Sequence, residues 1–323
     1  MSKVKVKKII AIVGPTASGK TKLGVNLAYY FNGEIISADS RQVYRGMDIG
    51  TGKDLKDFHL AVPDSNNLQE KYIDIPYHLI DVVLPEEKFS LANFCQMAQE
   101  AIKEIFQKNK IPIVVGGTGL YMQALVDEYN LTNSTPDYRK RAILENLSLL
   151  DVQNEIQKIN SDFFQQLNKS EQSNKRRLIR YLEQLQNGKN PFGLKGGNNN
   201  YEYLVIGIAQ SREVLSKRIY KRLISRLEGE GMIDEVKRLH EKDGVSWERL
   251  DDFGLEYRYI SLYLQKKINY KEMVEKLNIA IRQFAKRQMS WLRRWEKQGR
   301  KIYWVNDESE AKKVVADFLK KIK

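Results

Sequence analysis

The chain has few residues of the kinds that build covalent cross-links or metal centres. It contains a single cysteine, Cys95, so it can form neither an internal disulfide nor a cysteine-based metal site. Its three histidines are scattered along the sequence and show no spacing typical of zinc ligands. The sequence therefore excludes a disulfide-stapled fold and argues against a zinc enzyme.

Long apolar stretches are also missing. No run approaches the roughly 18 apolar residues that a bilayer-spanning helix needs. The basic N-terminus is followed by an apolar stretch covering only residues 9–13, shorter than the apolar region of about 7–15 residues in a signal peptide. We therefore expect a cytoplasmic protein with no membrane partner.

Positive charge is in excess. There are 54 Lys and Arg residues against 41 Asp and Glu residues, which gives a formal net charge of +13 and a pI near 9.4. Such an excess favours a nucleic-acid partner, although a basic surface that binds nothing has the same composition. The positions of the charges along the chain must separate these two interpretations.

Short runs rich in Ile and Val alternate with helical patterns. Strands are predicted at residues 8–13, 34–38, 111–115, 203–209 and 301–305, and helices at 20–31, 91–108, 211–227 and 270–298. This alternation predicts an α/β fold, in which a mostly parallel sheet of the P-loop NTPase type is flanked by helices.

The middle of the chain has a different texture. Between residues 126 and 200 the strand signals vanish, and charged helical patterns take over at 138–150, 151–159 and 175–186. The stretch 186–200 is rich in Gly and Asn and is typical of an exposed loop. We predict an all-helical insertion domain at 126–200 within a catalytic core made of residues 1–125 and 201–323.

One motif points directly to phosphate. Residues 14–21 read GPTASGKT, which fits the P-loop pattern G-x-x-x-x-G-K-[ST] between a predicted strand and a predicted helix. Backbone N–H groups and the helix N-terminus suit phosphate oxygens, Lys20 adds a positive charge, and the Thr21 hydroxyl can bind Mg²⁺. Most P-loops serve ATP or GTP, so the motif alone favours ATP binding and a kinase or NTPase.

Two other segments should reach the same edge of the sheet, because ligands bind beyond the carboxyl ends of parallel strands. The second predicted strand runs into Asp39, and the third runs into a glycine-rich turn that contains Thr118. Asp39 could act as a general base or bind Mg²⁺, but aspartate is equally common as a helix cap. Thr118 could equally be structural.

The predicted helices after residue 211 carry the most concentrated positive charge. Arg218, Arg222 and Arg226 repeat every four residues beside an apolar stripe made of Leu215, Ile219, Leu223 and Leu227. Residues 282–301 contain eight Lys or Arg residues against a single Glu, on a helix whose buried side is predicted to hold Met273, Leu277, Ile281, Phe284, Trp291 and Trp295. Such a run is often only a solvated face, but its imbalance favours contact with a nucleic-acid backbone.

Four blocks in order along the chain resemble the tRNA dimethylallyltransferases, also called tRNA isopentenyltransferases. The blocks are residues 14–53, 77–81, 115–121 and 281–293. The resemblance implies transfer of a dimethylallyl group from dimethylallyl diphosphate to N6 of adenine 37 in the tRNA anticodon stem-loop, with Mg²⁺ as cofactor. It also implies that the P-loop holds the diphosphate of an allylic substrate and not ATP.

The resemblance assigns roles to individual residues. Asp39 is expected as the catalytic base, with Thr21 and Arg222 stabilising the leaving diphosphate and Thr21 binding the metal. Diphosphate binding is expected at Gly14, Pro15, Thr16, Ala17, Ser18, Gly19, Lys20 and Thr21. Contacts to tRNA are expected at Asp39, Ser40, Arg41, Gln42, Thr118, Arg176, Arg177, Arg180, Lys286, Arg287, Gln288, Trp291 and Arg293.

The chain departs from the family pattern at three places. It reads FGLEYR at 253–258 where the family often has Gly-Tyr-Lys/Arg-Glu, it has an unusual segment at 168–174, and it has no zinc-finger extension of the eukaryotic kind. Three alternatives stay open: an adenylate isopentenyltransferase that makes a cytokinin, a P-loop kinase for a small molecule, and a non-catalytic RNA-binding module. We expect a monomer.

Overall fold

The computed structural model describes residues 6–63, 70–129, 138–188, 191 and 201–320. The chain divides into two compact units, one made of residues 1–126 and 200–323 and the other of residues 127–199. Among the described residues, no helix combines the length and the apolar character needed to cross a bilayer.

The larger unit is built on a six-stranded parallel sheet. Its order is β5-β2-β6-β1-β7-β8, and every pair of neighbours is parallel. The five predicted strands are all present, and the prediction of a mostly parallel α/β fold is confirmed. The strands are β1 (Lys7–Val13), β2 (Gly33–Ser37), β5 (Tyr77–His78), β6 (Ile111–Gly116), β7 (Tyr201–Ile208) and β8 (Tyr303–Val305).

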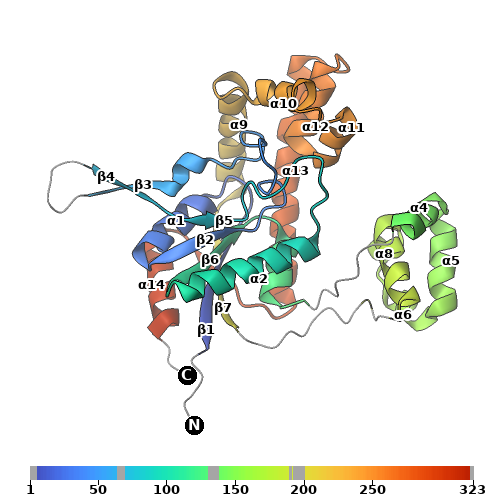
Figure 1. Cartoon of the computed structure of the whole chain (residues 1–323), viewed down its shortest axis with the longest axis horizontal. Coiled ribbons are helices and arrows are strands. Elements are labelled where there is room, and N and C mark those ends of the chain that lie inside the picture. The colour runs from blue at the N-terminus through green and yellow to red at the C-terminus, as the bar shows by residue number, and fades with distance from the viewer. Residues whose placement is uncertain (1–5, 64–69, 130–137, 189–190, 192–200, 321–323) are drawn as a thin grey trace, which may run out of the picture. The chain divides into compact units, whose positions relative to one another are not determined.

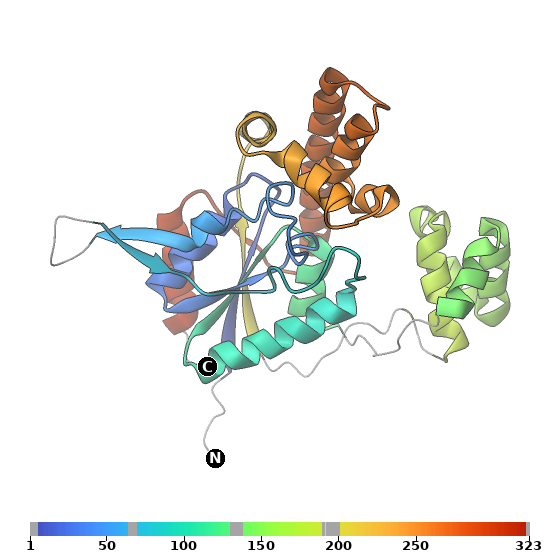
Figure 2. The same cartoon turned by 45° about the horizontal axis from the view of Figure 1, so that its top comes forward.

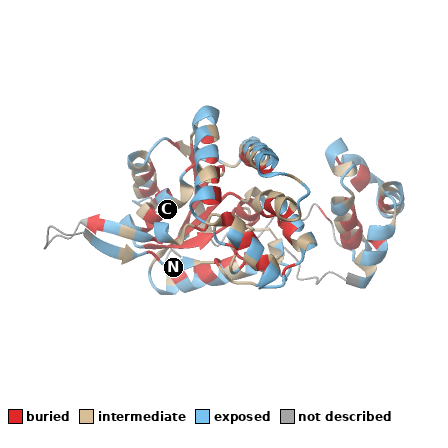
Figure 3. Ribbon diagram, turned by 90° about the horizontal axis from the view of Figure 1, so that it is seen from above, coloured by how far each residue is buried: buried red, intermediate tan, exposed pale blue. Residues whose placement is uncertain are grey.

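Helices cover both faces of this sheet (Figures 1 and 2). Helices α1 (Lys20–Tyr30) and α14 (Glu308–Lys320) pack on one face through a single hydrophobic cluster that includes Ile12, Leu27 and Val315. Helices α2 (Leu91–Gln107) and α3 (Gly119–Val126) lie on the other face. Strands β1, β2, β6 and β7 are accordingly buried along most of their length (Figure 3).

A small hairpin was not predicted. After the short helix η1 (Leu55–Phe58), the antiparallel strands β3 (His59–Pro63) and β4 (Glu70–Asp74) form a separate two-stranded sheet. Pro63 and the charged start of β4 weaken the strand pattern in the sequence.

A group of five helices gathers beyond the carboxyl ends of the strands (Figure 1). They are α9 (Arg212–Glu228), α10 (Met232–Glu241), α11 (Trp247–Phe253), α12 (Leu255–Leu264) and α13 (Tyr270–Lys297). A second hydrophobic cluster, which includes Met47, Leu223, Val236 and Leu277, ties these helices to the loop after β2. These helices therefore form one wall of any site at this edge.

The buried side of α13 differs in part from the prediction. Met273, Leu277, Ile281 and Trp295 are buried as expected, but Phe284 and Trp291 are only half-buried. Their places on the buried face are taken by Ala285, Gln288 and Leu292. The helix packs on α9, α12 and α3, and at Gln288 its buried face reaches the turns after β1 and β6.

The described residues of the smaller unit form helices and no strands, and they have their own hydrophobic core. Its helices are α4 (Tyr138–Asn146), α5 (Leu149–Ile159), α6 (Ser161–Gln166), α7 (Lys169–Gln172) and α8 (Lys175–Gln186). The predicted helix at 138–150 is wrong at its end, because Ser148 accepts a hydrogen bond from the Asp151 N–H and starts α5 as a capping box. Most of the predicted loop at 186–200 lies outside the described residues.

Candidate active site

The P-loop joins β1 to α1. Ala17 and Gly19 take left-handed backbone conformations, with φ of 62° and 93°. No side chain caps the start of α1, and its first turn contains no acidic residue. The first N–H groups of α1 are therefore available to an anion, and the helix dipole favours one.

The residues of the motif divide into two sets. Gly14, Pro15 and Ser18 are buried and shape the loop, since a Cβ on Gly14 would lie 2.8 Å from Ser18 Oγ. The others border a cavity of about 630 Å³: Thr16, Ala17, Gly19, Lys20 and Thr21. The motif thus presents five of its eight residues to a ligand.

The same cavity collects most of the predicted site residues. Its lining includes Asp39, Ser40, Arg41, Gln42, Thr118, Arg222, Arg287 and Gln288 in addition to the P-loop residues. These come from the loops after β1, β2 and β6 and from helices α9 and α13. Every described residue that lines the cavity belongs to the larger unit.

Positive side chains stand at the P-loop end. Burial lowers the pKa of Lys20 to about 8, with Asp39 opposing this effect and Arg222 adding to it. Burial and the neighbouring Arg226 lower the pKa of Arg222 to about 10, so it stays charged at neutral pH. Arg222 Nη2 donates to Thr16 Oγ1 at 2.5 Å. Two desolvated cations at one loop make a strong site for a diphosphate.

Asp39 lies in a tight turn that borders the same cavity as these cations. Its Oδ1 accepts from the Arg41 N–H at 2.9 Å, and the Ser40 N–H donates to Thr118 Oγ1 at 3.1 Å. The turn approaches β6 closely, since a Cβ on Gly116 would meet the Ala38 carbonyl oxygen at 2.2 Å. Gly116 is therefore required for Thr118 and Asp39 to share one edge of the cavity.

Three residues predicted as surface contacts have their polar groups engaged within the protein. Gln288 is 7% exposed, accepts from the Thr16 N–H at 2.8 Å and donates to the Gly117 carbonyl at 2.9 Å. Gln42 accepts from the Ser37 hydroxyl and donates to the Gly52 carbonyl. Arg226, expected on a presented stripe, is 3% exposed and pairs with Asp54 at 2.9 Å.

The remaining predicted tRNA contacts of the larger unit, Lys286, Trp291 and Arg293, are not among the described residues that line this cavity. Lys286 and Arg293 are exposed on α13, whereas Trp291 packs on Gly119, where an added Cβ would lie 2.5 Å from its ring. Arg176, Arg177 and Arg180 lie on α8 of the smaller unit. Arg177 pairs with Glu171 and Arg180 with Glu183, while Arg176 is exposed.

Sequence reasoning missed two residues of α12. Glu256 lines the cavity, and burial raises the pKa of its carboxyl group against the opposing charges of Arg222 and Arg226. Tyr257 is 2% exposed and closes one side of the cavity. The signal was present in the sequence, since both residues stand in the segment that departs from the family pattern.

The donors at the cavity suit a magnesium ion better than a metal held by protein alone. No group of three His, Cys, Asp or Glu side chains that could hold a metal occurs among the residues that the structure describes. The Thr21 hydroxyl and the Asp39 carboxylate both border the cavity beside the anion-binding loop. Mg²⁺ commonly uses one or two protein oxygens together with phosphate oxygens and water, which matches this donor set.

Comparisons with known proteins agree with this geometry. The family model for IPP transferase matches residues 42–295, and that for isopentenyl transferase matches residues 7–61. The tRNA dimethylallyltransferase 1 of Syntrophus aciditrophicus is 42% identical over 310 residues, covering 95% of this chain and 97% of its own. The tRNA dimethylallyltransferase 2 of Treponema denticola is 42% identical over 301 residues, covering 92% and 95%.

Solved structures give the same result. The tRNA isopentenylpyrophosphate transferase of Bacillus halodurans matches with a TM-score of 0.64 and 33% identity, covering 97% of this chain and 95% of its own. A eukaryotic dimethylallyltransferase acting on tRNA matches with a TM-score of 0.73 and 26% identity, covering 97% and 77%. A P-loop beside an aspartate turn, together with these matches over nearly the whole length, shows that the chain belongs to the IPP transferase family.

Proposed function

We propose that this protein transfers a dimethylallyl group from dimethylallyl diphosphate to N6 of adenine 37 in tRNA, releasing diphosphate. The observation that carries the proposal is the shared cavity, which is bordered by the cations Lys20 and Arg222 as well as by Asp39 and Thr118. A diphosphate needs the cations, and an adenine amine that loses its proton needs the carboxylate. Family membership supports the same chemistry.

The proposed reaction uses both the cations and the carboxylate at the cavity. The amine nitrogen attacks the allylic carbon and forms a C–N bond, while the C–O bond to the diphosphate breaks and its electron pair leaves with the oxygen. Lys20, Arg222 and the N–H groups of the P-loop stabilise the charge on the leaving diphosphate. Asp39 accepts the proton that the amine loses, because an exocyclic amine is a poor nucleophile until it is deprotonated.

Magnesium completes the proposed site. Thr21 would hold the ion at the P-loop, with Asp39 as the nearby carboxylate. When bound, Mg²⁺ supplies additional positive charge for the diphosphate oxygens.

The acceptor is proposed to be the anticodon stem-loop of a tRNA. The target base must leave its stack to enter the cavity, so the protein has to hold the surrounding backbone. Exposed cations on α13, including Arg287 at the cavity and Lys286 and Arg293 beyond it, support this. We propose that the protein acts as a monomer, since the P-loop, Asp39 and Arg222 of one chain border the same cavity.

One experiment tests this function against the alternatives. The purified protein is incubated with Mg²⁺ and labelled dimethylallyl diphosphate, with either unmodified tRNA or AMP as acceptor. We expect label in tRNA only. Label in AMP alone would identify an adenylate isopentenyltransferase, and transfer to neither acceptor would leave a kinase or an RNA-binding module.

A further inference from the structure

A buried carboxylate stands behind one wall of the cavity. Residues 48–54 form this wall, and Gly50, Thr51, Gly52 and Asp54 of this loop border the cavity directly. Glu235, in the first turn of α10, is 6% exposed and does not line the cavity itself. Glu235 can therefore influence the cavity only indirectly, through loop 48–54.

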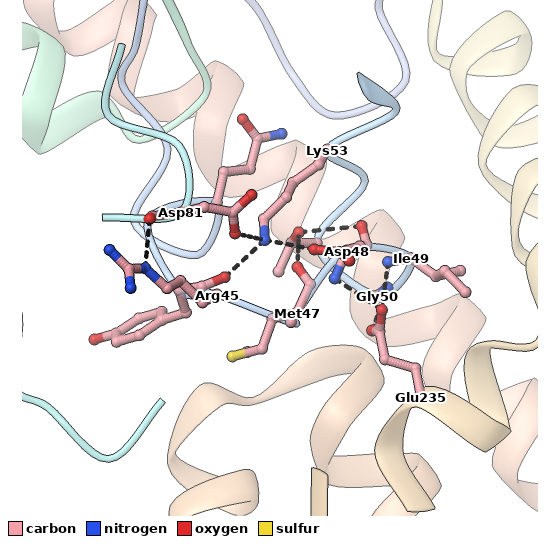
Figure 4. Close-up of polar contacts among 12 residues, drawn as sticks. Arg45, Met47, Asp48, Ile49, Gly50, Lys53, Asp81 and Glu235 are labelled. Carbon is pink, nitrogen blue, oxygen red and sulfur yellow. Dashed lines mark hydrogen bonds and ion pairs between the residues drawn. The ribbon is translucent and has the colours of Figure 1, made fainter. Parts of the chain in front are cut away.

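The Glu235 carboxylate accepts hydrogen bonds from three successive backbone N–H groups. Its Oε2 accepts from Asp48 N and Ile49 N, each at 2.7 Å, and its Oε1 accepts from Gly50 N at 3.0 Å (Figure 4). Consecutive N–H groups that converge in this way form an anion-binding concavity. Charge-assisted bonds to a buried carboxylate fix the loop more firmly than neutral contacts do.

Tyr257 completes the shell of this carboxylate. Its hydroxyl donates to Glu235 Oε1 at 2.9 Å, and both side chains are buried. A Cβ added to Gly50 would lie 2.7 Å from the Tyr257 hydroxyl, so the ring and the loop are already in close contact. Tyr257 belongs to segment 253–258, where the chain departs from the family pattern, and this segment therefore contacts Glu235.

The other end of the loop is held by a buried cation. Lys53 is 1% exposed, and its Nζ donates to the Tyr44 carbonyl at 2.7 Å and to Asp48 Oδ1 at 2.6 Å. It also pairs with Asp81, as Figure 4 shows. Loop 48–54 is thus clamped at both ends and can keep one conformation.

Two further contacts connect the clamped loop to the reacting groups. The Gly52 carbonyl accepts from Gln42 Nε2 at 3.0 Å. Gln42 follows Asp39 by three residues. Asp54 pairs with Arg226, one turn along α9 from Arg222. A shift of the loop would therefore move both the aspartate turn and the arginine helix.

We propose that Glu235, with Tyr257 as its hydrogen-bond partner, is a positioning residue for the transfer reaction. It holds loop 48–54 so that Asp39 and Arg222 keep their places at the cavity. This inference deepens the proposed function and rests on it. Misplacing reacting groups by about 1 Å costs up to roughly a hundredfold in rate.

The test compares Glu235→Gln and Tyr257→Phe with Asp234→Asn. Glu235→Gln puts an amide NH₂ against backbone donors, and Tyr257→Phe removes one hydrogen bond. Asp234→Asn removes a charge from the exposed neighbour of Glu235 on α10. We expect kcat for tRNA prenylation to fall about tenfold to a hundredfold in Glu235→Gln and about threefold to tenfold in Tyr257→Phe. KM for dimethylallyl diphosphate should stay within about threefold, and Asp234→Asn should match the wild type.

Hydrogen exchange gives a second readout that needs no activity. The amides of residues 48–50 should be protected in the wild type and in Asp234→Asn but exchange faster in the other two variants, while β1 stays protected. Unprotected amides in the wild type, or an unchanged kcat in both variants, would overturn the inference. If Glu235→Gln fails to fold, Tyr257→Phe decides alone. A wild type without transfer activity would refute the proposed function instead. Hydrogen exchange would still show whether Glu235 protects the amides of residues 48–50.

Discussion

At the scale of single residues, the proposed chemistry depends most on the carboxylate of Asp39. Asp39→Asn keeps an oxygen that can accept from the Arg41 N–H, but an amide cannot take a proton from the adenine amine. We expect prenyl transfer to fall by about 10²–10⁴-fold, with tRNA affinity unchanged in a gel-shift assay. Asp317→Asn, on an exposed position of α14, serves as the control. Near-normal turnover in Asp39→Asn would remove the residue from its role as base.

Lys20 should give the site a measurable pH dependence. A bound diphosphate favours the charged ammonium and raises its pKa above the value of about 8 in the free protein. Affinity for diphosphate is then complete below pH 8 and weakens as pH rises above it. Calorimetric titration with diphosphate between pH 6.5 and 9.5 checks this, using Lys20→Gln to separate the ligand's own ionisation. The same slope in both proteins would contradict the assignment.

Local motifs predicted those site residues whose position at the cavity follows from short-range geometry. The P-loop and Asp39 stand directly after strands, so their position at the sheet edge follows from the sequence. Gln288, Gln42 and Arg226 could not be assigned in the same way. Their amide and guanidinium groups are used inside the protein because of distant neighbours, such as Thr16 for Gln288 and Asp54 for Arg226.

At the scale of secondary-structure elements, the outer face of α13 is the best candidate for an RNA-binding surface. Arg287→Gln combined with Arg293→Gln should weaken tRNA binding and reduce the slope of log K against log salt by up to about two. Lys103→Gln with Lys313→Gln is a matched control, since both lysines are exposed on other helices. Equal slopes for the two double variants would show that the α13 charges are merely solvated.

Strand β2 contains a buried carboxylate that should govern acid stability. Burial would raise the pKa of Glu34, but hydrogen bonds from His78, Lys110 and Lys108 outweigh it and lower the pKa to about 2 from 4.5. The stabilisation is therefore present above pH 4.5 and lost as pH falls towards 2, and it amounts to about 2–3 kcal/mol. Urea unfolding of Glu34→Gln should show lower stability at pH 7 and a flatter acid limb. Parallel curves for the two proteins would contradict this.

The elements were predictable where the pattern is long and periodic. Strands β1, β6 and β7 and helices α1, α2 and α9 were found within a few residues because they combine apolar periodicity with clear ends. Strand β5 was missed because it has only two residues and exists through its pairing with β2. The boundary between α4 and α5 depends on one cap at Ser148, which a charged helical pattern obscures.

At the scale of the whole molecule, a single core mutation should destabilise the helical unit without affecting diphosphate binding by the larger unit. Ile156 is fully buried in the core of the helical unit, whereas the described residues that line the cavity all belong to the larger unit. Ile156→Ala should cost about 2–5 kcal/mol in that unit and leave diphosphate affinity unchanged. Calorimetric titration with diphosphate and hydrogen exchange over α5 and α8 measure the two effects. Loss of diphosphate binding would show that the larger unit depends on the helical one.

Gln288 has a thermodynamic consequence for the two substrates. One face of α13 contacts the P-loop through the Gln288 side chain, and the other carries the exposed arginines. An RNA that shifts this helix therefore changes the affinity for diphosphate, and by linkage diphosphate changes the affinity for RNA by the same factor. The strength of the coupling between the two substrates then depends on one glutamine on one helix.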